Sequence, residues 1–348
     1  MNTKNEIHGL TIFRFIAAFY VFIFHCNLRF KVDAPEIVSN FIHNGAIGMT
    51  FFFVLSGFVM SWSSRDGIKD NYFRSRLARI YPAYLFMGLV SLPFILDYNA
   101  INIPVYIGVF LTMSQSFFTG TFPIWNFGGS WSVSTEMFFY ITFPLLFLTI
   151  KRNPLISLAA SVIISSLIIP ISIVFSGHSA FPQYYISPIH RLPEFISGVA
   201  LGCLYSSGFR IKRFKVSLLL ISIIAIVFLS PYNNDGWTKN NYVTLPSTCI
   251  MVYLLACFNI KKGIFTSPLI FLGKISYSFY LMQLPIVLFT VKYHYMFEWA
   301  PVWVVWILLG LINLAMSVIC YYMVEANTFI SRLLISKSKT SIKKPQSE

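Results

Sequence analysis

Long apolar runs separated by short polar stretches dominate this chain of 348 residues. Six stretches carry no Asp, Glu, Lys or Arg, and each contains or approaches the roughly 20 apolar residues that a membrane-spanning helix needs: 98–135, 153–190, 216–234, 240–260, 275–291 and 299–324. With 56% hydrophobic and only 11% charged residues, the chain is too apolar to cover a soluble surface. The pattern predicts an all-α, polytopic integral membrane protein.

The apolar runs predict about ten transmembrane helices, at 10–27, 45–62, 77–96, 132–150, 155–175, 186–205, 216–230, 243–259, 264–291 and 301–324. Basic loops near Arg79 and Lys151 are both assigned to the cytoplasmic side, so an even number of crossings must separate them. Of three candidate segments there, 104–118 is the shortest, and a stretch rich in Gly, Pro and Ser follows it. We therefore expect 104–118 to be re-entrant or interfacial, with both termini cytoplasmic.

The charge of +14 is concentrated in short loops, as the positive-inside rule requires, which argues against nucleic-acid binding. The cytoplasmic assignment gathers 19 of the 26 Lys and Arg residues. Residues 1–330 form the expected membrane domain, and 331–348 form a basic, disordered tail that fixes topology or touches anionic lipid. The scattered cysteines and histidines have no metal-ligand spacing, so no metal site and no disulfide framework are expected.

Arg14 and His25 lie inside the first apolar run. Eleven residues are close to three helical turns, so both side chains project from one face, about 16 Å apart along the axis. Ionisable residues within a membrane segment are costly and are functional by default. The simpler alternative is that Arg14 snorkels to headgroups while His25 makes an interfacial hydrogen bond.

Arg74, Arg76 and Arg79 gather at the cytoplasmic start of the third predicted span. Guanidinium groups bind phosphate in bidentate fashion, so this cluster suits a phosphate-rich ligand. A purely topogenic role, as a positive-inside anchor, is the alternative.

Trp131, Ser132 and Glu136 enter the fourth predicted span from outside. Glu136 is expected near the depth of His25, where a carboxylate can orient an imidazole or bind a sugar hydroxyl. A structural ion pair, for example with Arg191, is the competing interpretation.

Arg191 and Glu194 in the sixth predicted span have the i to i+3 spacing of a local ion pair, and are also candidates for acceptor binding. Tyr277 enters the ninth predicted span within a run that contains further tyrosines. It is a candidate for substrate binding, with an aromatic-belt role as the alternative.

Together these residues resemble the membrane-embedded acyltransferase-3 family of bacterial polysaccharide O-acyltransferases. The resemblance covers nearly the whole chain in order and rests on the Arg14 to His25 spacing, the FFxxSG element at 51–57, Arg76 with Arg79 and Pro82, the WSxxxE element at 131–136 with Tyr140 and Pro144, Arg191 with Phe195 and Gly198, and Ser276 with Tyr277 and Leu281. The chain departs from the family at Phe15, at Gln283, where many members have histidine, and at Ala326 with Asn327.

The resemblance implies a bacterial inner-membrane enzyme that moves an acyl group, acetyl from acetyl-CoA, to a hydroxyl of a lipid-linked or surface glycan such as the LPS O-antigen. It implies CoA binding by the arginines 14, 74, 76 and 79, and a stand-alone form without a fused esterase-like domain. His25 is the expected general base, and Glu136 would orient or polarise His25 or the acceptor. Transfer through an acyl-imidazole intermediate remains an alternative mechanism. The oligomeric state stays open, with a homodimer as one candidate.

Two other functional classes remain open from the residues alone. Intramembrane His, Glu and Arg also form proton relays, so a proton-coupled transporter or flippase of a glycan or lipid precursor is the main alternative. A non-catalytic scaffold for envelope synthesis is the second.

Overall fold

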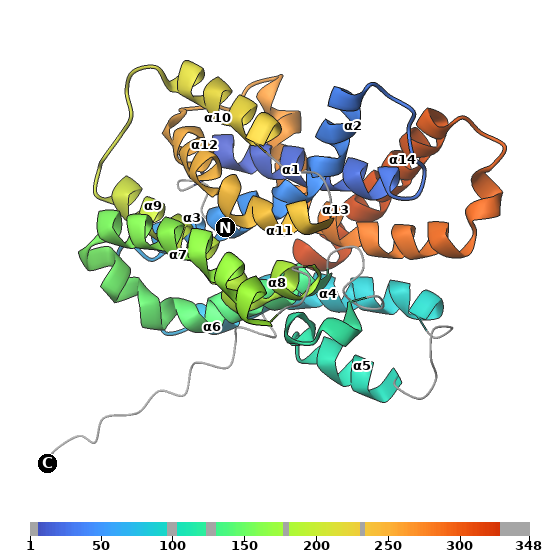
Figure 1. Cartoon of the computed structure of the whole chain (residues 1–348), viewed down its shortest axis with the longest axis horizontal. Coiled ribbons are helices and arrows are strands. Elements are labelled where there is room, and N and C mark those ends of the chain that lie inside the picture. The colour runs from blue at the N-terminus through green and yellow to red at the C-terminus, as the bar shows by residue number, and fades with distance from the viewer. Residues whose placement is uncertain (1–5, 96–102, 123–129, 177–180, 230–233, 328–348) are drawn as a thin grey trace, which may run out of the picture.

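The computed structural model describes residues 6–95, 103–122, 130–176, 181–229 and 234–327, and every regular element in these ranges is helical (Figure 1). The predicted all-α class is confirmed. The elements are α1 (His8–Asn27), α2 (Glu36–His43), η2 (Asn44–Ile47), α3 (Gly48–Ser63), α4 (Tyr72–Ile95), α5 (Ile103–Leu111), η4 (Gln115–Phe117), η5 (Thr119–Thr121), α6 (Ser130–Arg152), α7 (Pro154–Ser176), α8 (Gln183–Ile186), α9 (Pro188–Ser206), α10 (Lys215–Leu229), α11 (Asn234–Val243), α12 (Leu245–Cys257), α13 (Thr266–Lys292), η6 (His294–Phe297), α14 (Val302–Cys320) and η7 (Tyr321–Glu325).

Seven helices of the described chain are long and apolar enough to cross a membrane, which makes this a multi-pass membrane protein. They comprise α1, the run from α2 through α3, then α4, α6, α7, α13 and the run from α14 through η7. The three other predicted spans are helical too, as α9, α10 and α12, but α10 has 15 residues and α12 only 13. The count of ten crossings and the side of the termini stay predictions, and the predicted tail at 331–348 lies outside the described residues.

The segment predicted not to cross, 104–118, forms a short helix followed by one tight turn, η4, and a second turn, η5, comes directly after it. Helix α5 has nine residues, about 13 Å, against a hydrocarbon core of about 30 Å. The buried side chain of Gln115 ties the following turn to its neighbours: its amide donates to the Tyr84 hydroxyl at 2.8 Å and to the Ser130 carbonyl at 2.9 Å. Irregular backbone inside a membrane bundle is tolerated where protein groups satisfy its polar atoms.

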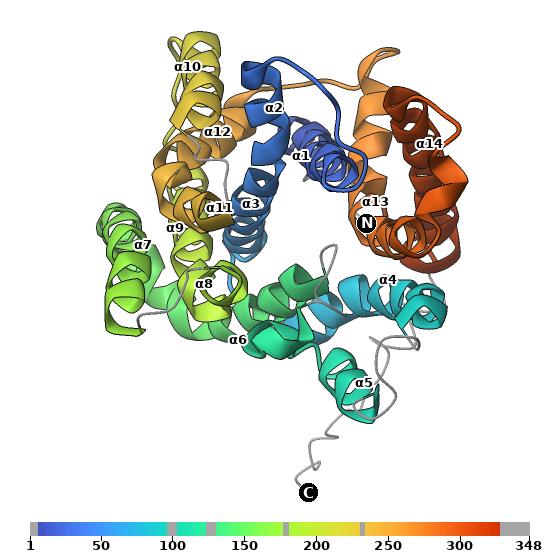
Figure 2. The same cartoon turned by 45° about the vertical axis from the view of Figure 1, so that its right-hand side comes forward.

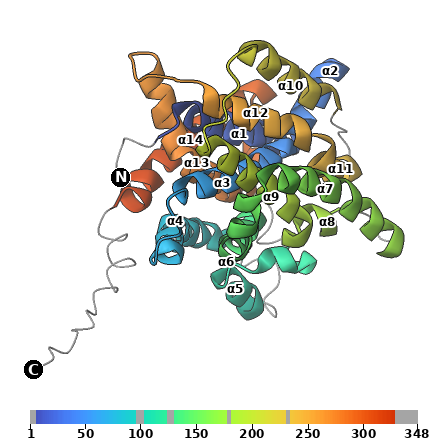
Figure 3. The ribbon, with the colours of Figure 1, turned by 90° about the vertical axis from the view of Figure 1, so that its left-hand side faces the viewer.

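Five helices form a closed ring in the order α1, α3, α6, α4 and α13, each contacting the next (Figure 2). Helix α14 packs outside the ring against α13 and α1, whereas α9 covers α3 from the opposite side, together with α7, α10 and α12 (Figure 3). The ring brings segments that are distant in sequence to one central space.

Glycines permit the closest helix crossing, between α3 and α9. A Cβ atom on Gly198 would lie 1.9 Å from the Val54 carbonyl oxygen, and one on Gly57 would lie 2.1 Å from that of Phe195. Small residues of this kind let backbones approach in membrane bundles, where packing rather than hydrophobicity drives association.

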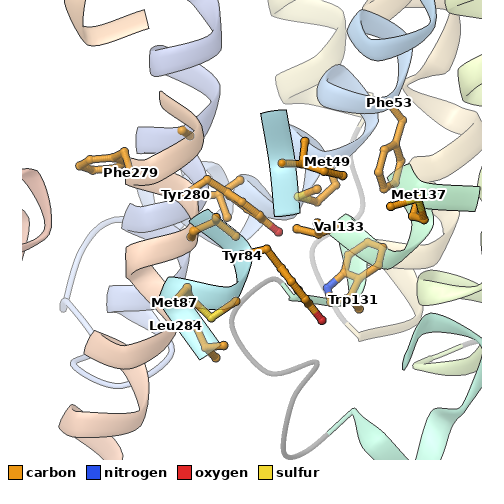
Figure 4. Close-up of a cluster of buried hydrophobic side chains, with 14 of the residues drawn as sticks. Met49, Phe53, Tyr84, Met87, Trp131, Val133, Met137, Phe279, Tyr280 and Leu284 are labelled. Atoms are coloured by element: carbon orange, nitrogen blue, oxygen red, sulfur yellow. The ribbon is translucent and has the colours of Figure 1, made fainter. Parts of the chain in front are cut away.

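Large apolar side chains fill the space beside the ring centre. In Figure 4, Met49 of α3, Val133 of α6 and Tyr280 of α13 gather on one side, with Phe53 and Trp131 nearby. All five are buried. All but Trp131 line the cavity described next.

Candidate active site

Helix α1 borders two separate pockets. The first, which we call the arginine pocket, lies inside the ring, has a volume of about 110 Å³ and is lined by all five ring helices. Its polar lining consists of Arg14, Ser56, Arg76, Arg79, Ser132, Glu136, Tyr140, Ser276, Tyr277 and Tyr280. The second, the histidine pocket, is much smaller, with a volume of about 10 Å³, and lies where α1, α13 and α14 meet. It is lined by Phe22, His25, Cys26, Arg29, Phe30, Gln283, Ile286, Val287, Thr290 and Leu309.

Three guanidinium groups converge on the arginine pocket, from Arg14 on α1 and from Arg76 and Arg79 on α4. Arg76 donates to the Ser63 hydroxyl at 2.8 Å. Among the described residues, neither Arg14 nor Arg79 has a hydrogen-bond or ion-pair partner. Arg74 is exposed and does not line the pocket, so the structure brings together three of the four arginines predicted to bind the donor.

Glu136 lies in the arginine pocket and not beside His25. Its Oε1 atom accepts hydrogen bonds from the Ser56 hydroxyl at 3.1 Å and from the Tyr140 hydroxyl at 2.6 Å. The expected contact between Glu136 and His25 is therefore not formed, nor is the alternative pair with Arg191. The contact with Tyr140 was visible in the sequence, because position 140 follows position 136 by about one helical turn and the two side chains share a helix face.

Two further predicted residues, Ser132 and Tyr277, also line the arginine pocket. The Tyr277 hydroxyl donates to the Ile80 carbonyl at 3.0 Å, which fixes α13 against α4. The Ser132 and Tyr280 hydroxyls lie 2.8 Å apart and join α6 to α13. Tyr280 was not among the predicted site residues.

Arg191 and Glu194 form the predicted local ion pair, but away from both pockets. Their side chains are fully buried, with Arg191 Nε 3.0 Å from Glu194 Oε2. The guanidinium carbon lies 4.8 Å from the ring centre of Phe53, 5.5 Å from that of Tyr185 and 5.8 Å from that of Trp131. Trp131 thus packs against this pair instead of lining a pocket, and the structure does not bring these three predicted acceptor residues to the site.

In the histidine pocket, His25 pairs with Gln283, which is not one of the predicted site residues. His25 Nδ1 lies 3.1 Å from Gln283 Oε1. Arg29, one turn further along, donates to the His25 carbonyl at 3.4 Å and places a positive charge in the same pocket. In the sequence, Gln283 stands out only as a departure from the family's histidine, and no local spacing links it to a site. Arg29 is not among the predicted site residues either.

The profile of the acyltransferase domain family matches residues 7–322, which include both pockets. The chain belongs to the acyltransferase-3 family. It is 27% identical over 314 residues to the acyltransferase MdmB of Streptomyces mycarofaciens, an alignment that covers 81% of this chain and 79% of MdmB. It is 26% identical over 364 residues to the O-acetyltransferase OatA of Staphylococcus aureus, covering 93% of this chain and 57% of OatA. No solved structure matches the chain.

Membership in the acyltransferase-3 family makes this chain an acyltransferase and confirms the resemblance drawn from its motifs. The chain spans about four fifths of MdmB but little more than half of OatA. In this family member, the two residues of the first-helix motif, Arg14 and His25, line different pockets.

Proposed function

We propose that the protein transfers an acyl group, acetyl in the first instance, from acyl-CoA to a hydroxyl of an envelope glycan, in the bacterial cytoplasmic membrane. The observation that carries the proposal is the arginine pocket, with two guanidinium groups that form no hydrogen bond or ion pair with a described residue. Guanidinium groups without an ion-pair partner favour an anionic ligand, and the forked donors of arginine match phosphate oxygens. The phosphates of CoA supply such a ligand.

The reaction itself is assigned to the histidine pocket. The acceptor hydroxyl oxygen attacks the thioester carbonyl while His25 takes the hydroxyl proton; the carbon–sulfur bond then breaks, and the proton passes to the CoA thiolate. The products are an O-acyl ester and CoA. Arg29, in the same pocket, stabilises the negative charge of the tetrahedral intermediate.

The two pockets share no lining residue, so the donor must extend along α1. The distance from Arg14 to His25 along the helix is about 16 Å. On the stretch of α1 from Arg14 to His25, Phe15 and Phe22 pack against the Phe279 ring of α13, with centroids 5.0 and 5.7 Å apart. We propose that these rings separate when the thioester arm reaches the histidine pocket.

Glu136 belongs to the donor side in this proposal. Its carboxylate is held by Ser56 and Tyr140 and faces the charge of Arg14. By holding the carboxylate in place, the two hydroxyls keep it from pairing with the arginines that the donor needs.

The test uses the full chain, purified and placed in lipid vesicles with acetyl-CoA labelled in the acetyl group. Envelope glycan, lipid-linked or as lipopolysaccharide, is added as acceptor, and mass spectrometry locates the modified sugar. The proposal predicts labelled ester on the glycan together with release of CoA. Substrate-dependent proton flux without ester formation would instead support a transporter, and failure to bind acetyl-CoA would contradict the donor assignment.

A further inference from the structure

Gln283 bridges two points of α1 from the neighbouring helix α13. Its Oε1 atom lies 3.1 Å from His25 Nδ1, and its Nε2 atom donates to the Ala18 carbonyl at 3.1 Å. Ala18 and His25 are seven residues apart, about two turns, so both partners lie on the same helix face. One side chain thereby hydrogen-bonds both the backbone of α1 and the imidazole of His25.

The backbone contact determines which way the amide points. A carbonyl oxygen only accepts hydrogen bonds, so the NH₂ group of Gln283 must face Ala18 and the amide oxygen must face His25. An amide oxygen also only accepts, so the proton between the two side chains belongs to His25 Nδ1. In the neutral ring, Nε2 then carries the free lone pair.

Burial makes it hard for water to replace these two hydrogen bonds of Gln283. Gln283 and Ala18 are both fully buried, and the histidine pocket around them is lined mostly by apolar side chains, such as Phe22 and Ile286. Water cannot easily replace either partner there, and a buried amide that loses a partner is left unsatisfied.

We propose that Gln283 is a positioning residue that holds His25 in the Nδ1-protonated form, so that Nε2 is the atom that takes the proton of the acceptor hydroxyl. This inference rests on the proposed function. The amide oxygen also accepts from the imidazolium formed during the reaction, so the contact persists in both protonation states. A neutral amide cannot itself take the proton, which confines the base to Nε2.

The test compares two buried glutamines. Gln283→Met keeps the length of the side chain but removes the strong acceptor and both donors. Its kcat is expected to fall about 10- to 100-fold, the loss typical of residues that orient a functional histidine, with the KM for acetyl-CoA unchanged. Gln115→Met removes a comparable buried amide that lines neither pocket, and it is expected to keep the wild-type kcat.

A second substitution tests the acceptor directly. Gln283→Glu keeps an oxygen that accepts from His25 Nδ1, so it should retain a higher kcat than Gln283→Met. Acetyl-CoA binding reports folding of each variant. If Gln283→Met does not bind, Gln283→Asn replaces it, because its amide is one methylene too short to reach both partners and should show the same loss of kcat.

Three results would overturn the inference: a wild-type kcat in the Met or Asn variant, a change confined to KM, or equal kcat values for the Glu and Met variants. An inactive His25→Ala enzyme beside a fully active Gln283→Met enzyme would reject only the role of Gln283. A wild-type protein that transfers no acetyl group would reject the proposed function itself.

Discussion

Arg14 and His25 project from one face of α1, yet they line two different pockets. Arg14 joins the arginines of α4 inside the helix ring, whereas His25 faces Gln283 at the junction with α14. One helix therefore connects a cationic pocket to a pocket that holds a base. Donor binding and proton transfer should then respond separately to substitution.

The arginines of α4 are expected to set donor affinity. A hydrogen bond to a charged group contributes about 1.5–3 kcal/mol, so Arg76→Ala and Arg79→Ala should each weaken acetyl-CoA binding about 10- to 150-fold. Arg74→Ala is the control, because Arg74 is exposed and lies outside the pocket lining. Equilibrium binding of labelled acetyl-CoA measures the effect, and an equal loss in all three variants would contradict the pocket assignment.

Tyr140→Phe tests the placement of Glu136. The substitution removes the 2.6 Å hydrogen bond to the carboxylate, which is then free to turn towards the positive charge of Arg14. The KM for acetyl-CoA should rise about tenfold or more while kcat at saturating donor stays the same. Tyr295→Phe, at an exposed position, should change neither constant. A fall in kcat at constant KM would place Glu136 and Tyr140 at the reacting groups.

Loss of one partner from the buried pair Arg191 and Glu194 should be costly. Arg191→Ala leaves a buried, uncompensated carboxylate and is expected to lower the free energy of unfolding by about 3–5 kcal/mol. Replacing the pair together, as Arg191→Met with Glu194→Leu, should cost less. Asp66→Ala, in an exposed pair, should cost about 0–1 kcal/mol. Unfolding in detergent measures all three, and similar losses for the single and paired changes would refute this account.

The crossing of α3 and α9 should not tolerate a methyl group. Gly198→Ala places a Cβ atom 1.9 Å from the Val54 carbonyl oxygen, so the helices must separate. The yield of monodisperse protein on size-exclusion chromatography should fall. Gly108→Ala provides the control, because a Cβ atom there meets nothing within 4 Å. A normal yield of Gly198→Ala would show that the crossing can relax.

Hydrophobic runs were sufficient to predict ten helical segments of this chain, whereas the short helix α2 and nearly all of α11 lie outside the predicted spans. All ten predicted spans are helical, and the segment at 104–118 is too short and too broken to cross. Local spacing also predicted the ion pair of Arg191 with Glu194, because both residues belong to one helix.

The sequence pattern did not predict the contacts between helices. Depth along the membrane placed Glu136 near His25, but depth does not specify direction around the bundle, and Glu136 faces the helix ring instead. The pairing of His25 with Gln283 joins residues 258 positions apart, so no local spacing could indicate it. The family motifs indicated which residues belong to the site, and the packing of the five ring helices determines which of these residues line the same pocket.

The most direct test of two separate pockets is a pair of measurements on His25→Ala: equilibrium binding of acetyl-CoA and transfer of acetyl to glycan. The account predicts that binding stays at the wild-type level, because His25 does not line the arginine pocket, and that transfer is abolished. His43→Ala, which lies outside both pockets, should retain both properties. Wild-type transfer by His25→Ala, or loss of acetyl-CoA binding in that variant, would contradict the account.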